Sequence, residues 1–345
     1  MPRRQERSRL HRDPVLAPLV LQPRDLAILR DAFLHRFAST PALLLSAFAA
    51  SNGRGMQYAC KRLSLLWRAG YIERFRSHHS MYLHGSEPFL YAMGSGKASA
   101  AARTGLPPHA ISQDRWRAVL AEATPARERT RAALLAAGVP ITEIDRGLHN
   151  TTEILLKHYS GTSSGVQHYV LTSDLAALLW FSARRHGWSV DDIQPDGVAD
   201  LSMRDPEPHR SRALITAHGI LPIQPDCLFT IAGHRLAIEA ETGSTSRAAL
   251  TRKLHRYARR FEITEDPTTR VLVHCATEAH AELTLTVIGG EIPSAQRARF
   301  LVSYASATRA LLRASDESGR MLTAPVFHAA TAHGSGPTAL FARSV

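Results

Sequence analysis

The chain of 345 residues contains no apolar run long enough to cross a membrane. A membrane-spanning helix needs about 18 consecutive apolar residues, and the longest apolar stretch covers only residues 41–50. The N-terminal residues 1–7 are positively charged, but no apolar segment and no small-residue cleavage site follow them, so a secretory signal is not expected. These absences predict a cytoplasmic protein that does not associate with membranes.

Cysteine is scarce as well. The three cysteines, Cys60, Cys227 and Cys275, are far apart in the chain and form no Cys-x-x-Cys pair. An odd and scattered set is typical of a reduced compartment rather than of a disulfide framework or a zinc site. We expect all three to be buried free thiols.

Acidic residues are few at the N-terminal end of the chain. Residues 1–110 hold 16 of the 42 Lys and Arg residues but only 6 of the 30 Asp and Glu residues. A field of one sign suits a phosphate backbone or an anionic membrane. The basic arm over 1–21 lacks the aromatic residues that stack on single-stranded bases and the bulky apolar face of a membrane anchor. We expect a disordered arm and a partner of double-stranded DNA rather than RNA or a membrane.

Apolar residues recur at helical spacing in three segments of the region 22–100. The first helix is expected to begin at Pro23, and the second follows a capping signal at 39–41. The third is expected over 56–69 and ends at Gly70, a residue that commonly terminates helices.

Two alternating segments follow, at 71–75 and 89–94, and they can pair as a ribbon. Three helices and a ribbon are typical of a winged helix-turn-helix domain, whose third helix enters the major groove of DNA. A winged helix that binds proteins is the alternative, but the clustered positive charge favours DNA. The expected DNA-binding side chains are Arg54, Gln57, Lys61, Arg62, Arg68, Arg74 and Arg76.

Residues 101–165 are expected to connect two domains. They contain a double proline, an Ala- and Arg-rich helical stretch at about 114–137 and a polar segment that ends at 160–165. Segment 161–165 matches the GxSxG of a nucleophile elbow, and 94–97 partly matches a phosphate-binding loop. Neither segment has the flanking residues that its motif requires, so neither is taken as a site.

An apolar helix through residues 178–181 is expected after the connector. Thr172 or Ser173 can cap its first turn, in which Asp174 would face the positive end of the helix dipole. His168 and Asp174 are retained as accessory residues of a site formed further along the chain.

Three carboxylates stand in the segment 224–243, which is predicted to be a β-hairpin. Glu239 and Glu241 share one face of its second strand, because alternate residues of a strand point to the same side. A turn at Gly233 would bring Asp226 opposite these glutamates. Carboxylates so close repel one another unless a cation lies among them. Oxygen ligands favour Mg²⁺ or Mn²⁺, ions that polarise a phosphodiester and activate water.

A helix over about 247–262 is expected to follow the hairpin. Lys253 and Tyr257 lie one turn apart beside its apolar stripe. Lys253 can therefore point toward the carboxylates, where a cation would hold the attacking water or stabilise a pentavalent phosphate. The apolar run 270–275 is predicted to be the next buried strand of the same sheet.

The chain resembles the replication-relaxation family of plasmid and mobile-element proteins, which includes relaxases for conjugative transfer. The segments that carry the resemblance are PDCLFTI at 225–231, HRLAIEAETGSTS at 234–246 and LTRKLHRYARRF at 250–261, behind a winged helix. Their order also resembles the PD-(D/E)XK nuclease core. In all, the resemblance covers about residues 22–95 and 168–305.

The resemblance implies that Asp226 and Glu239 are metal ligands and that Lys253 is the catalytic lysine, moved from the strand to the helix. Glu241 stands where the nuclease pattern has lysine, which makes it a third ligand or a base behind the ligands. Tyr257 is an accessory residue. The implied partner is double-stranded DNA at an origin-like site, bound by a monomer or a homodimer.

The leading hypothesis is a metal-dependent DNA nuclease or relaxase-like nickase. One alternative is a non-catalytic replication initiator or regulator with an inactive nuclease-like domain. Another is an exposed acidic hairpin whose glutamates pair with Arg247 and Arg252 and perform no chemistry. A relaxase with a two-histidine metal site is disfavoured, because none of the 18 histidines occurs as His-x-His. The formal tyrosine nucleophiles are Tyr159, Tyr169 and Tyr257, for which packing or hydrogen bonding is the competing role.

The predicted fold is α/β, of the α+β kind. It consists of a basic arm (1–21), a winged helix-turn-helix domain (22–100), a connector (101–165), a PD-(D/E)XK restriction-endonuclease-like mixed sheet flanked by helices (166–330) and a flexible tail (331–345). Segment 322–328 is interpreted as either a final strand or part of a partner-binding tail.

Overall fold

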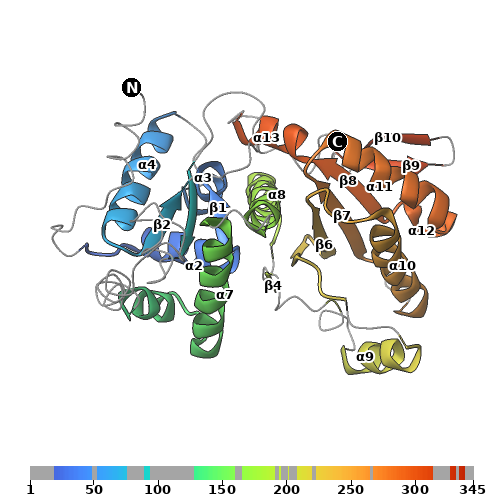
Figure 1. The fold of residues 1–345 in the computed structure, drawn as a ribbon, viewed down its shortest axis with the longest axis horizontal. Helices are drawn as coiled ribbons and strands as arrows, with labels where there is room; N and C mark the ends of the chain where they lie inside the picture. Colours follow the sequence, from blue (N-terminus) through green and yellow to red (C-terminus); the bar gives the residue numbers. More distant parts are fainter. Residues whose placement is uncertain are drawn as a thin grey trace. The chain divides into compact units, whose positions relative to one another are not determined.

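The computed structural model describes residues 19–48, 53–75, 89–93, 128–159, 165–190, 194–195, 201, 208–219, 223–264, 267–313, 327–331 and 334–338. The chain divides into two compact units, Met1–Ser173 and Asp174–Val345. Each unit combines helices with its own sheet (Figure 1), so the predicted mixed α+β class is confirmed. Every helix in these residues is too short or too polar to span a bilayer. The basic arm lies outside them up to residue 18.

Three helices and a small sheet open the N-terminal unit. The helices are α2 (Pro23–Leu34), α3 (Thr40–Phe48) and α4 (Gly53–Arg68), and the strands are β1 (Phe37–Ser39), β2 (Ile72–Phe75) and β3 (Leu90–Met93). The strands form an antiparallel sheet in the order β1-β3-β2. The three predicted helices and the pairing of the two ribbon strands are therefore confirmed.

Strand β1 is an element that the sequence does not predict. Helical spacing places Phe37 on the buried face of the first helix, but α2 ends at Leu34 and Arg36 adopts a φ of 60°. Phe37 then pairs opposite Ala92 of β3, and its ring contacts that of Phe75 edge-on. A strand of three residues is too short to show an alternating pattern, which is why the helical interpretation prevails in the sequence.

Part of the predicted connector belongs to the core of the N-terminal unit. A helix over 128–136 and helix α7 (Ile141–Tyr159) contribute apolar side chains to the same cluster as α2 and α4. The contributing residues are Ala133, Leu134, Val139, Ile144 and Leu148. The prediction of a linker is thus wrong for these residues, and a fragment that ended at residue 110 would lose part of its core. Residues 101–127 lie outside the described structure.

Helix α4 ends at Arg68, and Gly70 follows it as the predicted terminating residue. The residue has a φ of +84°, a conformation that a residue with a Cβ adopts only at a cost. Gly70→Ala is expected to lower the free energy of unfolding by about 1 kcal/mol, measured by urea denaturation. Gly290→Ala is the control, because Gly290 lies in a helix with open space around it. An equal loss in both variants would contradict the role of the backbone angle.

The C-terminal unit is built on a mixed sheet of seven strands in the order β10-β9-β8-β7-β6-β5-β4. The strands are β4 (Gln194–Pro195), β5 (Cys227–Ile231), β6 (His234–Glu241), β7 (Thr269–Cys275), β8 (Phe300–Tyr304), β9 (Phe327–Thr331) and β10 (Gly334–Thr338). Strands β6, β7 and β8 are parallel, and the remaining neighbours are antiparallel. The predicted buried strand after the long helix is confirmed as β7.

Helices accompany this sheet, and two of them cover one of its faces. They are α9 (Pro208–Ala217), α10 (Arg247–Thr264), α11 (Glu278–Glu291), α12 (Ser294–Arg297) and α13 (Ala305–Arg313). Helices α10 and α11 lie side by side (Figure 1), and their apolar side chains share a core with Ala237, Val271 and Val302 of the central strands. The helix predicted over about 247–262 is therefore confirmed.

Helix α8 (Gly165–Arg185) begins earlier than the sequence predicts. Thr172 and Ser173, interpreted as caps, lie inside it, where their hydroxyls donate to the carbonyls of His168 and Val170 at 3.1 Å. Ser and Thr make this kind of bond in helix interiors as well as at caps, so residue type alone does not locate the helix start.

The end of the chain is more ordered than predicted. Strand β10 covers Gly334–Thr338, within the expected flexible tail, and pairs with β9 antiparallel. Strand β9 begins at Phe327, so only the last two residues of segment 322–328 are seen in a strand, and 322–326 lie outside the described structure. The sequence of β10, Gly-Ser-Gly-Pro-Thr, has low strand propensity, and its partner strand supplies the pairing.

Candidate active site

The hairpin that carries the acidic residues forms as predicted. Strands β5 and β6 pair antiparallel with Cys227 opposite Ile238, and Gly233 makes the turn with a φ of +79°. Asp226 immediately precedes β5, and its backbone N–H donates to the carbonyl of Ile238 at 3.0 Å. Asp226 is thereby held beside Glu239 at the end of the neighbouring strand.

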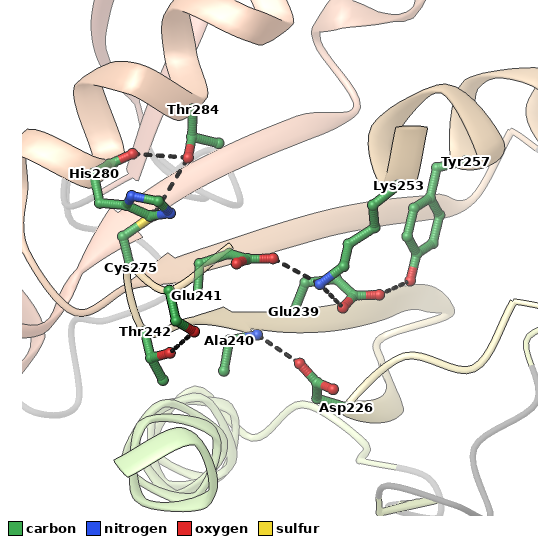
Figure 2. A network of polar contacts seen from close by, with 11 residues as sticks. Asp226, Glu239, Ala240, Glu241, Thr242, Lys253, Tyr257, Cys275, His280 and Thr284 are labelled. Carbon is green, nitrogen blue, oxygen red and sulfur yellow. Dashed lines mark hydrogen bonds and ion pairs between the residues drawn. The ribbon is translucent and has the colours of Figure 1, made fainter. Parts of the chain in front are cut away.

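Glu239 and Glu241 are buried on the face of β6 that α10 covers. Their exposed fractions are 4% and 1%, which is unusual for ionisable side chains. Lys253 and Tyr257 project from α10 toward the two carboxylates, as Figure 2 shows. The predicted approach of Lys253 to the glutamates is therefore present, whereas the contact of Tyr257 with Glu239 is not predicted from the sequence.

Lys253 bridges the two glutamates. Its Nζ lies 2.6 Å from Oε1 of Glu241 and 3.1 Å from Oε2 of Glu239. The other oxygen of Glu239 accepts a hydrogen bond from the hydroxyl of Tyr257 at 2.5 Å. Both oxygens of Glu239 thus have donors supplied by one helix, one turn apart.

Asp226, which lies just before strand β5, is the third carboxyl of the cluster. Its Oδ2 accepts a hydrogen bond from the backbone N–H of Ala240 at 2.7 Å (Figure 2). The hydrogen bond holds this carboxyl at the edge of the hairpin, close enough for its charge to act on Glu239 and Lys253. The sequence does not predict this hydrogen bond, because the backbone N–H of almost any residue at 240 could donate it.

Burial and charge shift the proton affinity of these groups. Loss of water raises the pKa of Glu239 to about 7, and the nearby Asp226 adds to the shift. Burial by itself would lower the pKa of Lys253, but Glu239 and Glu241 outweigh it and raise that pKa above its usual value. Burial and Glu239 keep the pKa of Tyr257 well above normal. Lys253 is therefore a cation and Tyr257 a hydrogen-bond donor at neutral pH.

The cluster differs in one respect from the predicted metal site. Within the described residues, no group of three or more His, Cys, Asp or Glu side chains is arranged to hold a metal ion. The ammonium of Lys253 lies between the two glutamates, where a divalent cation is predicted from the sequence. The donor set nevertheless fits Mg²⁺ or Mn²⁺, because these ions prefer oxygen ligands and Asp226 adds a carboxyl near Glu239.

The interpretation of the hairpin as an exposed acidic feature is wrong. It requires solvent-facing glutamates that pair with Arg247 and Arg252, but both glutamates are buried and bind Lys253. Arg247 and Arg252 are themselves exposed on α10.

Of the three accessory residues, Tyr257 belongs to this cluster. Tyr257 is fully buried and binds Glu239. Asp174 is buried inside α8, with Oδ2 3.9 Å from Nε of Arg309, so the predicted role in a first helical turn is wrong. In the N-terminal unit, the ring of His168 makes an edge-to-face contact with the ring of Tyr169.

The formal tyrosine nucleophiles have packing or hydrogen-bonding contacts. Tyr169 packs against Phe37, with ring centroids 5.7 Å apart, and the hydroxyl of Tyr257 is bound to Glu239. The side chain of Tyr159, at the end of α7, lies outside the described structure.

Some of the predicted DNA-binding side chains are exposed, some make contacts within the N-terminal unit, and two lie outside the described residues. Gln57, Lys61 and Arg68 are exposed along one face of α4. Arg62 forms an ion pair with the fully buried Asp25 of α2, with Nε 2.6 Å from Oδ1, so its guanidinium joins two helices of the unit. Arg74 of β2 stacks over the ring of Trp67 at 3.8 Å. The side chain of Arg54 and the whole of Arg76 lie outside the described residues.

The three cysteines are free, but they are not all buried. Cys227 and Cys275 are buried as predicted, whereas Cys60 is exposed on α4. Cys275 stands opposite Glu241 on the parallel strand β7. Burial raises the pKa of Cys275 to about 12, so this thiol stays protonated beside the carboxylates and is no nucleophile.

Comparison with known proteins adds no relative to this description: no family model matches the chain, and neither the curated proteins nor the solved structures yield a match.

Proposed function

We propose that the chain is a metal-dependent DNA endonuclease or nickase that acts in the replication or mobilisation of plasmids or other mobile elements. The observation that carries the proposal is the buried pair Glu239 and Glu241, bridged by Lys253 at 3.1 and 2.6 Å beside Asp226. Burying charged carboxylates destabilises a fold unless they are compensated. Such clusters of buried ionisable groups with shifted pKa values are typical of catalytic sites.

The order of elements around the cluster supports the proposal. Helix α8 is followed by β4, helix α9 and the hairpin of β5 and β6, and then by α10 and β7; β4, β5 and β6 pair antiparallel, and β7 pairs parallel with β6. This order resembles the PD-(D/E)XK nuclease core, in which an Asp at the second strand and an acidic residue in the third hold the metal. In the proposal Asp226 and Glu239 correspond to these two residues, and Lys253, which reaches Glu241 from α10, takes the place of a lysine at 241.

In this proposal Asp226, Glu239 and Glu241 would hold Mg²⁺ or Mn²⁺. Such an ion polarises a phosphodiester and lowers the pKa of bound water. Lys253 carries the positive charge that stabilises a pentavalent phosphate, and its partly exposed side chain can reach a substrate oxygen. Tyr257 orients Glu239 through its hydroxyl. Binding of the ion requires that Lys253 release at least one of the two glutamates.

The N-terminal unit supplies DNA binding in the proposal. Its element order, α2, β1, α3, α4, β2 and β3, and its sheet order β1-β3-β2 resemble a winged helix. Helix α4 would then be the recognition helix. Among the side chains that the structure describes, Gln57, Lys61 and Arg68 are available for DNA and are exposed at spacings of four and seven residues on one face of α4.

A non-catalytic replication initiator or regulator is the second candidate. It is favoured by the position of the Lys253 ammonium, which compensates Glu239 and Glu241 without a metal ion. It is also favoured by the acidic residue at 241, where the nuclease pattern has lysine. In this candidate the cluster stabilises the fold, and the N-terminal unit alone confers function.

Incubation of supercoiled plasmid with the full chain and Mg²⁺ or Mn²⁺ separates the two candidates. The wild type is expected to relax the plasmid, and Asp226→Ala is expected to slow relaxation by at least about a hundredfold, because one metal ligand is lost. Glu282→Ala, which removes an exposed carboxylate of α11, is the control and is expected to retain wild-type activity. Metal-independent binding of DNA without relaxation would favour the non-catalytic candidate.

A further inference from the structure

The outward face of α10 is a stripe of basic side chains. Arg252, His255, Arg256 and Arg259 are exposed, whereas Leu250, Leu254, Tyr257, Ala258 and Phe261 of the same helix are buried. Spacings of three, four and seven residues place the exposed residues on one side of a helix. The stripe lies on the side of α10 opposite its apolar contact with the sheet.

The charge of this face is not balanced along the helix. Helix α10 contains six Lys and Arg residues and one acidic residue, Glu262. Like charges at spacings of three and four residues repel each other and weaken a helix. Lys253 is committed to the glutamates and Arg260 is buried, so the exposed positive charge of the helix comes from the other arginines, and Glu262 is the only carboxylate in the helix. A clustered set of exposed arginines is favourable when an external anion lies against it.

The neighbouring helix has the opposite charge. Helix α11 contains three glutamates and no Lys or Arg, and Glu278, Glu282 and Glu291 are exposed. Helices α10 and α11 lie side by side (Figure 1). An extended anion is therefore attracted to α10 and repelled from α11, which confines it to a strip along α10.

The dimensions of the stripe fit a DNA backbone. A helix rises about 1.5 Å per residue, so the stretch from Arg252 to Arg259 is about 10 Å long. A DNA strand carries one phosphate per about 3.4 Å of axis, which gives about three phosphates over this length. Arginine is well suited to these contacts, since its planar guanidinium forms paired hydrogen bonds with phosphate oxygens.

The stripe is also adjacent to the carboxylate cluster. Lys253 and Tyr257 point inward from the same turns of α10 that carry Arg252 and Arg256 outward. We propose that the exposed face of α10 binds the phosphate backbone of double-stranded DNA and guides one strand toward Lys253. The choice of duplex DNA as the ligand rests on the proposed function, whereas the presence of an anion-binding face rests on α10 alone.

The test is the binding of a fluorescently labelled DNA duplex to the full chain in EDTA, over a series of KCl concentrations. Arg252→Glu/Arg259→Glu is expected to weaken binding at least about tenfold and to reduce the slope of log K against log salt by about 2, one for each lost phosphate contact. Arg252→Lys/Arg259→Lys keeps the charge and is expected to keep most of the affinity.

The control changes the net charge by the same amount elsewhere. Arg146→Glu/Arg185→Glu alters exposed arginines of α7 and α8 and is expected to bind within about twofold of the wild type with a similar salt slope. All variants should show the thermal melt of the wild type by circular dichroism. An affinity and salt slope of Arg252→Glu/Arg259→Glu equal to those of the control would overturn the proposal.

Other outcomes separate this inference from the proposed function. A wild-type chain that binds the duplex through α10 but does not relax plasmid would refute the nuclease and leave the binding face intact. A chain that relaxes plasmid while its binding is insensitive to Arg252 and Arg259 would refute only the binding face. A wild type that does not bind duplex DNA would refute both.

Discussion

Lys253→Met is expected to lower the free energy of unfolding by about 3 kcal/mol, since removal of one partner of a buried ion pair leaves an uncompensated charge. The ammonium is the nearest cation to Glu239 and Glu241 in the described cluster, at 3.1 and 2.6 Å. The lower end of the usual range applies, because the Lys253 side chain is 32% exposed. Urea denaturation at neutral pH measures the change.

The control for this prediction is the preceding residue. Arg252→Met removes an exposed cation of the same helix and is expected to change the free energy of unfolding by less than about 0.5 kcal/mol. Addition of Mg²⁺ should stabilise Lys253→Met more than the wild type, because the ion can replace the missing charge. A loss in Lys253→Met no greater than that in Arg252→Met would show that the glutamates do not depend on the lysine.

The affinity for Mn²⁺ is expected to fall about tenfold for each pH unit below 7, or about a hundredfold between pH 7 and pH 5, because a metal ligand must lose its proton. Burial raises the pKa of Glu239 to about 7, so this carboxyl holds a proton over that interval. Titration of the full chain with Mn²⁺, followed by electron paramagnetic resonance of the free ion, measures the affinity. Glu239→Gln should bind more weakly and show a much shallower pH dependence.

The raised pKa of Glu239 also makes the stability of the fold depend on pH. A carboxyl with a raised folded-state pKa binds more protons in the folded chain than in the unfolded chain between its ordinary pKa of 4.5 and about 7. Its contribution to stability is therefore present at pH 4.5 and lost as the pH rises toward 7. Glu239→Gln should remove this decline in stability.

The Mn²⁺ prediction has its own contradicting outcome. A Mn²⁺ titration with the same pH slope in the wild type and in Glu239→Gln would assign the proton to another group.

Several elements were predictable because their patterns are local. The hairpin at Gly233, the helix beginning at Arg247 and the strand that ends at Cys275 all follow from alternation, helical spacing and turn residues. The placement of Lys253 toward the acidic strand also follows, because a helix joined to the end of that strand packs across it. The sequence therefore supports most of the proposed site.

Other features depend on contacts between distant segments. Strand β1 exists because Phe37 pairs with β3, more than fifty residues later, and β10 exists because β9 lies beside it. The sequence predicts a connector over 101–165, but apolar residues between 133 and 148 pack in one cluster with Leu29 and Leu63. Sequence patterns report local periodicity and not the partner that buries a segment.

The amino-acid sequence alone determined the concentration of positive charge near the N-terminus and the set of acidic, lysine and tyrosine side chains that can meet at one strand. Only the tertiary structure decided how charge is distributed among them. It buried Glu239 and Glu241, bridged them with Lys253 and turned Arg252 and Arg259 outward. The reason is that solvation and charge pairing depend on which elements pack together, and residues far apart in the chain create that environment.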